Sequence, residues 1–145
     1  MDFSTGLRVS ASGLAAQRMR MNTISSNIAN INTTRTPEGG PYRRKDVVFE
    51  AMPEARTFGE MLTSAPDDSL QRVQVTDVHV DQNAVEMRYE PDHADANAEG
   101  YVAYPKINLM EEMANMIQAT RSYEANVSAI QASKDMALGA LEIGR

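Results

Sequence analysis

Cysteine and tryptophan are absent from this sequence of 145 residues, and the other aromatic side chains are scarce, with three Phe and five Tyr. The lack of cysteine excludes disulfide bonds, thiolate catalysis and zinc sites built from cysteine. Few aromatic residues together with ten Met favour adaptable helix interfaces over a rigidly packed core.

Long apolar runs and an excess of positive charge are also missing. No stretch approaches the roughly 18 apolar residues of a membrane span, and the start of the chain lacks the basic and apolar regions of a secretory signal peptide. The net charge of −6 argues against nucleic acid or an anionic membrane surface as a partner, because either would prefer a basic face. On composition alone, the chain would be placed in the cytosol.

Residues for a chemical site are equally few. The only histidines are His79, in a predicted strand, and His93, which lies between Asp92 and Asp95. A single cluster of this kind favours a turn closed by the acidic side chains over a metal site. No nucleophile elbow, phosphate-binding loop, dinucleotide motif or HExxH helix occurs. We therefore expect no catalytic residue, no cofactor and no metal, and a metal hydrolase built on the two histidines is the least favoured alternative.

A heptad pattern occupies the last third of the chain. From Leu109 to Leu141, alternating steps of four and three residues land mostly on apolar side chains, which predicts a coiled-coil helix. Asn108 is placed to cap the first turn, Glu111 occupies the capping-box position, and Pro105 prevents helix from extending upstream. Such a helix cannot bury a narrow apolar seam on itself, so it requires a partner helix.

The same steps from Phe3 to Ile31 predict a second heptad helix at the start of the chain. Gly6 and Gly13 each cost up to about 1 kcal/mol relative to Ala, so this helix should be weak alone. We expect the two terminal helices to pair as a coiled coil. The residues predicted to form this assembly seam are Leu7, Leu14, Met21, Ile24, Ile28, Ile31, Leu109, Met113, Met116, Tyr123, Val127 and Ile130.

The middle of the chain begins with a predicted loop at Thr36–Tyr42, where two prolines flank two glycines. The basic run Arg43–Lys45 is either a solvated charge run or a contact with an acidic partner. Val47–Phe49 is typical of a short strand. Residues Ala51–Asp68 contain Pro53, Gly59 and Pro66 and few apolar residues at a regular spacing. This composition predicts a surface loop.

Leu70–Val80 carries the clearest strand pattern, although its two pairs of valines are out of phase across Thr76 and Asp77, which predicts a β-bulge or tight turn there. The segments that follow are predicted as a turn (81–83), a strand (84–89), a loop (90–100) and a short strand (101–102). The sequence thus predicts an α+β chain with a coiled-coil helix at 1–35, a loop and small β-rich module at 36–104, and a coiled-coil helix at 105–145.

Several segments resemble signature sequences of the flagellar rod and hook axial proteins. Ile24–Thr33 is similar to the N-terminal signature of that family, and Asn108–Asn126 is similar to its C-terminal signature. Thr36–Arg44 and Tyr89–Tyr101 resemble segments of one branch, the proximal-rod proteins. On these residues the chain is identified as a member of the flagellar basal-body rod family.

The resemblance implies a structural subunit without enzymatic activity. Such subunits polymerise with other rod proteins and copies of themselves into the drive shaft that crosses the periplasm and transmits torque for motility. They leave the cytoplasm unfolded through the flagellar type III export apparatus without a cleaved signal peptide, which would replace the cytosolic location suggested by composition. The surrounding basal-body ring is a further partner that the resemblance leaves open. The alternative from another class is a secreted helical effector or adaptor that binds one partner through its terminal helices.

Overall fold

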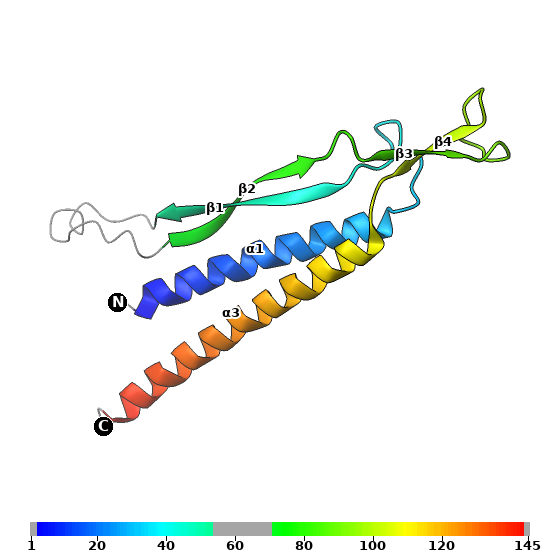
Figure 1. Ribbon diagram of the computed structural model, residues 1–145. Helices are drawn as coiled ribbons and strands as arrows, with labels where there is room; N and C mark the ends of the chain where they lie inside the picture. The colour runs from blue at the N-terminus through cyan, green and yellow to red at the C-terminus, as the bar shows by residue number, and fades with distance from the viewer. Residues whose placement is uncertain (1–2, 54–70, 144–145) are drawn as a thin grey trace.

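The computed structural model describes residues 3–53 and 71–143. Its elements are, in chain order, α1 (Phe3–Ala29), β1 (Lys45–Pro53), β2 (Gln71–Val80), β3 (Val85–Tyr89), β4 (Tyr101–Pro105) and α3 (Leu109–Ile143). In the elongated molecule of Figure 1, α1 lies between the β1–β2 pair and α3, both termini lie at one end, and β3 and β4 lie at the other. This confirms the predicted α+β arrangement of two long, packed terminal helices with small antiparallel sheets between them.

The two helices pack antiparallel. Asn27, near the end of α1, contacts Glu112, near the start of α3. Gly13, two heptads before Asn27, faces Asn126, two heptads after Glu112. The contacts therefore repeat every seven residues on both helices, as in a coiled coil. Towards the termini the helices separate (Figure 1).

The start of α3 follows the predicted cap. The Oδ1 atom of Asn108 accepts a hydrogen bond from the backbone N–H of Met110 at 3.1 Å, and its carbonyl oxygen accepts one from the N–H of Glu112 at 3.0 Å. An asparagine in this position satisfies backbone donors that a helix leaves unpaired in its first turn. The helix therefore begins at Leu109.

The β1–β2 pair is antiparallel and contains the predicted irregularity. Val48 pairs with Asp77, whereas Phe49 pairs with Val75, so Thr76 is the extra residue of a bulge. A bulge shifts the side-chain alternation by one residue, which is why the valines on either side of it are out of phase.

The predicted loop beginning at Ala51 is wrong for its first three residues. Strand β1 continues to Pro53, because Ala51 pairs with Val73 and the ladder extends to the pair of Pro53 with Gln71. The remainder of that predicted loop, from residue 54, lies outside the described residues.

The β3–β4 pair joins the β-rich module to α3. Val102 and Tyr104 of β4 are buried, together with Ala84 just before β3. The Tyr104 hydroxyl donates a hydrogen bond to Glu90 at 2.9 Å, and the Arg88 guanidinium lies 4.8 Å from the centre of the Tyr104 ring. Among the described helices, none combines the length and the apolar character that crossing a membrane requires.

Candidate assembly interface

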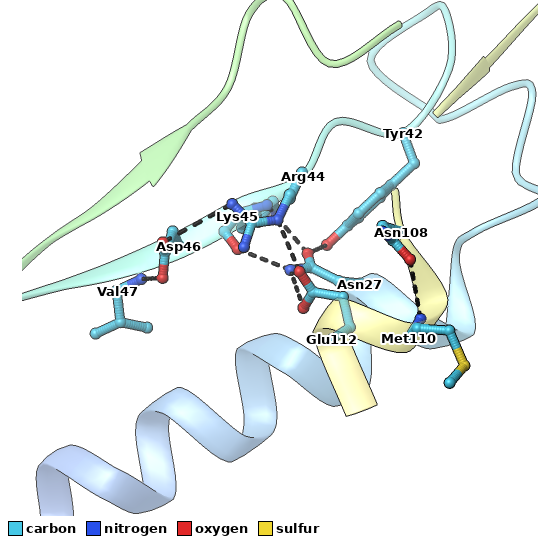
Figure 2. A network of polar contacts seen from close by, with 9 residues as sticks. All are labelled: Asn27, Tyr42, Arg44, Lys45, Asp46, Val47, Asn108, Met110 and Glu112. Atoms are coloured by element: carbon cyan, nitrogen blue, oxygen red, sulfur yellow. Dashed lines mark hydrogen bonds and ion pairs between the residues drawn. The ribbon is translucent and has the colours of Figure 1, made fainter. Parts of the chain in front are cut away.

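A network of polar groups lies where the two helices meet the start of β1 (Figure 2). We call it the polar junction and define it as Asn27, Tyr42, Arg44, Lys45 and Glu112. Asn27 and Glu112 are each only 1% exposed. Buried polar groups of this kind are costly unless they are hydrogen-bonded.

Every polar atom of the Asn27 side chain has partners. Its Nδ2 atom donates to the carbonyl oxygen of Lys45 at 2.8 Å and to Oε2 of Glu112 at 3.1 Å. Its Oδ1 atom accepts from the backbone N–H of Lys45 and from the Tyr42 hydroxyl, both at 3.0 Å. Asn27 therefore bonds both backbone groups of the first residue of β1, as a neighbouring strand would, and holds α1 against that strand.

Arg44 and Glu112 form the charged half of the polar junction. The Nε atom of Arg44 lies 2.7 Å from Oε1 of Glu112, and the Arg44 side chain is 26% exposed. Burial alone would lower the pKa of Arg44, but the hydrogen bond and charge of Glu112 outweigh it and raise that pKa above its ordinary value. One interpretation of the basic run Arg43–Lys45 was a contact with an acidic partner. Arg44 makes such a contact, and the acidic group is Glu112 of the same chain.

Beyond the junction, small and polar side chains occupy part of the helix contact. Ala16 of α1 and Ala119 of α3 are buried, and a Cβ atom placed on Gly13 would lie 3.1 Å from the Asn126 side chain. The stripe of α3 that is buried or half-buried advances in steps of four and three through Glu112, Met116, Ala119, Tyr123, Asn126 and Ile130. Gly13 therefore permits a close approach of the helices, in addition to weakening α1.

The predicted seam residues of α1, and Ile31 in the turn that follows it, all lie in protected positions. Ile24 is buried, and the others are half-buried: Leu7, Leu14, Met21, Ile28 and Ile31. Met21 accepts a contact from the Thr120 hydroxyl of α3, with the oxygen 3.7 Å from the sulfur. On α3, Met116, Tyr123, Val127 and Ile130 are half-buried as well.

Leu109 and Met113 are the exceptions, because they are 43% and 47% exposed in the chain. The prediction that they hold the pair within one chain is wrong, since Glu112 and Ala119 occupy the positions facing α1. A search for large apolar residues does not select Glu112 or Ala119, because Glu112 carries a charge and the side chain of Ala119 is a single methyl group.

The exposed side of α3 carries large apolar side chains. Met110 is 73% exposed and Ile117 is 56% exposed, and with Met113 they follow one another at helical spacing along the first turns. We call Met110, Met113 and Ile117 the outer stripe. Met136, Leu138 and Leu141 are also exposed near the end of the helix. Contiguous exposed apolar residues of this kind mark surfaces that bind other proteins.

Among the described residues, no group of three or more His, Cys, Asp or Glu side chains is placed to hold a metal ion, so neither histidine belongs to such a group. Nδ1 of His93 accepts a hydrogen bond from the backbone N–H of Asp95 at 3.1 Å. Asp95 in turn accepts from the Thr34 hydroxyl at 2.8 Å. These bonds close the loop before β4 and connect it to the segment after α1.

The chain is similar in sequence to flagellar rod proteins. The flagella basal body rod protein family model matches residues 7–35, and the model for the C-terminal part of flagellar basal body rod FlgEFG proteins matches residues 98–143. The chain is 40% identical to the flagellar basal-body rod protein FlgC of Borreliella burgdorferi, over 99% of the chain and 98% of the relative. It belongs to the FlgC family of flagellar basal-body rod proteins. FlgC of Bacillus subtilis is 44% identical over 96% of both chains, and FlgC of Escherichia coli O6:H1 is 36% identical over 94% of both.

The FlgC family relation confirms the resemblance drawn from the terminal signature segments. Asn27 lies in the segment matched by the first model and Glu112 in the segment matched by the second. The two matched segments thus meet in the polar junction of this FlgC-family chain. No local sequence pattern joins Asn27, Arg44 and Glu112, because these residues are far apart in the chain.

Proposed function

We propose that this FlgC-family chain is a structural subunit of the proximal rod of the flagellar basal body. It carries out no catalysis and transmits torque for motility through its contacts with other subunits. The observation that carries this proposal is the similarity to FlgC proteins over nearly the whole length of the chain. Its partners are other rod proteins and further copies of the chain.

The exposed surface of α3 supports assembly through the terminal helices. The polar junction and the contact with α1 use one side of α3 and leave the outer stripe uncovered in the single chain. A contact between two different surfaces of identical or similar subunits generates a helical filament when its rotation does not close into a ring. We propose that neighbouring subunits cover the outer stripe in the rod.

Delivery through the flagellar type III export apparatus, without a cleaved signal peptide, is also part of the proposal. A chain that passes a narrow channel has to be unfolded, and this sequence has no cysteine that could form a covalent cross-link. The described residues bury few large apolar side chains, so unfolding exposes little apolar surface and costs correspondingly little.

The proposal is tested by producing the chain in a flagellated bacterium whose own FlgC gene has been deleted. Swimming should be restored, and the chain should copurify with basal bodies. A chain that stays in the cytosol and does not restore swimming would contradict the proposal and favour the adaptor alternative.

A pair of neighbouring substitutions tests the role of the outer stripe. Ile117→Asp changes an exposed residue, so folding stability should change by no more than about 0.5 kcal/mol, yet an uncompensated charge in a subunit contact should abolish swimming. Gln118→Asp is the matched control, because Gln118 lines a polar cavity that also contains Arg20 and Arg44. Equal swimming by both variants would show that the outer stripe is not a subunit contact.

A further inference from the structure

The polar junction brings together three segments that are distant in the sequence. Asn27 comes from the last turns of α1, and Glu112 from the first turn of α3 (Figure 2). Lys45 is the first residue of β1, and Arg44 immediately precedes that strand. Asn27 bonds to both other segments, through Lys45 and Glu112, and Glu112 bonds to both as well, through Asn27 and Arg44. The full set of bonds forms only when all three segments take their positions together.

The contact between the helices does not by itself define one alignment. It repeats every seven residues, and outside the polar junction it consists of small and half-buried side chains such as Gly13, Ala119 and Asn126. A shift of α3 by seven residues along α1 would bring a residue of the same heptad position into each contact. A repeating seam of this kind specifies register poorly unless one position carries a polar group that requires a particular partner.

Glu112 is such a position. After a shift by seven residues in one direction it would lie beyond Ala29, where α1 ends. After a shift in the other direction it would lie opposite Arg20, whose guanidinium is already held 4.5 Å from the centre of the Phe49 ring. In both cases Glu112 would lose Arg44, and Asn27 would lose a partner for its buried amide, which is costly for both groups.

We propose that Asn27, Arg44 and Glu112 set the register of the two terminal helices and connect that register to the start of β1. The ion pair between Arg44 and Glu112 then contributes mainly to the choice of alignment. Buried ion pairs are weak sources of stability but can select one alignment, because every competing alignment leaves the charge without its partner. This role is a property of the folded chain and does not depend on the proposed place in the rod.

The absence of cysteine from the chain allows a direct measurement of register. Gly13→Cys with Asn126→Cys places two thiols at a position of close approach in the observed alignment. Gly6→Cys with Asn126→Cys, and Gly13→Cys with Ser133→Cys, place them where they would meet only after a shift by seven residues in either direction. Each purified full-length variant is oxidised gently, and the disulfide-linked peptides are quantified by mass spectrometry after proteolysis.

The register pairs are then combined with a substitution that removes only the charge. In Glu112→Gln, we expect the yield of the shifted disulfides relative to the observed one to rise about tenfold, which corresponds to about 1.4 kcal/mol of register preference. Glu111→Gln is the matched control, because it removes the exposed carboxylate next in the chain and should leave the ratio unchanged. Identical ratios in the two variants would overturn the proposal.

A second variant separates register from stability. Arg44→Leu with Glu112→Leu replaces the ion pair by apolar side chains, which in other buried pairs is often neutral or stabilising. We expect this double variant to keep its helical content while the shifted disulfides form. A double variant that forms only the Gly13–Asn126 disulfide would show that the pair does not set the register, and one that loses its helices altogether would show that the pair serves stability. Either result would overturn the proposal.

Discussion

Replacing Ala119 by leucine should destabilise the chain substantially, although the apolar pattern of the sequence places this residue outside the seam. Ala119 is 2% exposed and lies in the stripe of α3 that faces α1. A leucine adds three carbon atoms at this buried position, and overpacking of a helix contact typically costs about 1–3 kcal/mol. Ala125→Leu makes the same chemical change on the exposed side of the helix and shares any effect of helix propensity, so the difference between the two variants measures the packing.

The assay is urea unfolding of the purified chain, followed by far-ultraviolet circular dichroism. With an m value of about 2 kcal/mol/M, a loss of about 2 kcal/mol lowers the unfolding midpoint of Ala119→Leu by about 1 M. The midpoint of Ala125→Leu should stay close to that of the unmodified chain. If both variants unfold at the same urea concentration, Ala119 does not face α1 and the alignment described here is incorrect.

Five further substitutions test local features of the structure. Gly6→Ala should stabilise α1 by up to about 1 kcal/mol, and Gly13→Ala should gain less, because a Cβ at Gly13 would lie 3.1 Å from a side-chain amide of α3; a larger urea midpoint for the second variant would contradict the close contact. Asn108→Ala should cost about 1 kcal/mol by removing the helix cap, whereas Asn108→Asp keeps an acceptor and should change the urea midpoint little. The hydrogen bond to Glu90 raises the pKa of Tyr104 above its ordinary value, so the stability that it contributes is present at neutral pH and is lost as the pH rises through this raised pKa. Tyr104→Phe should remove a component with a raised pKa from the tyrosine titration measured by ultraviolet absorbance, and the absence of such a component from the unmodified chain would show that the bond does not form.

The secondary structure of this chain could be predicted from the sequence to a large extent, because it depends on local patterns. Each signal can be recognised from residues that are close in the sequence: the steps of four and three residues, the cap at Asn108, and the alternating valines around Thr76. The helix pair, the cap and the bulge were therefore predicted correctly. The end of β1 was not, because Ala51–Pro53 become strand only through pairing with β2.

The alignment of the helices was decided by the tertiary structure alone. Hydrophobicity ranks Leu109 and Met113 above Glu112 and Ala119, yet the second two residues face α1. A methyl group fits where two helices approach closely, and a carboxylate can be buried once Arg44 and Asn27 provide its hydrogen bonds. Both conditions depend on residues that are distant in the sequence, so the sequence by itself determined that two long helices would pair, and only the folded chain determined which of their sides meet.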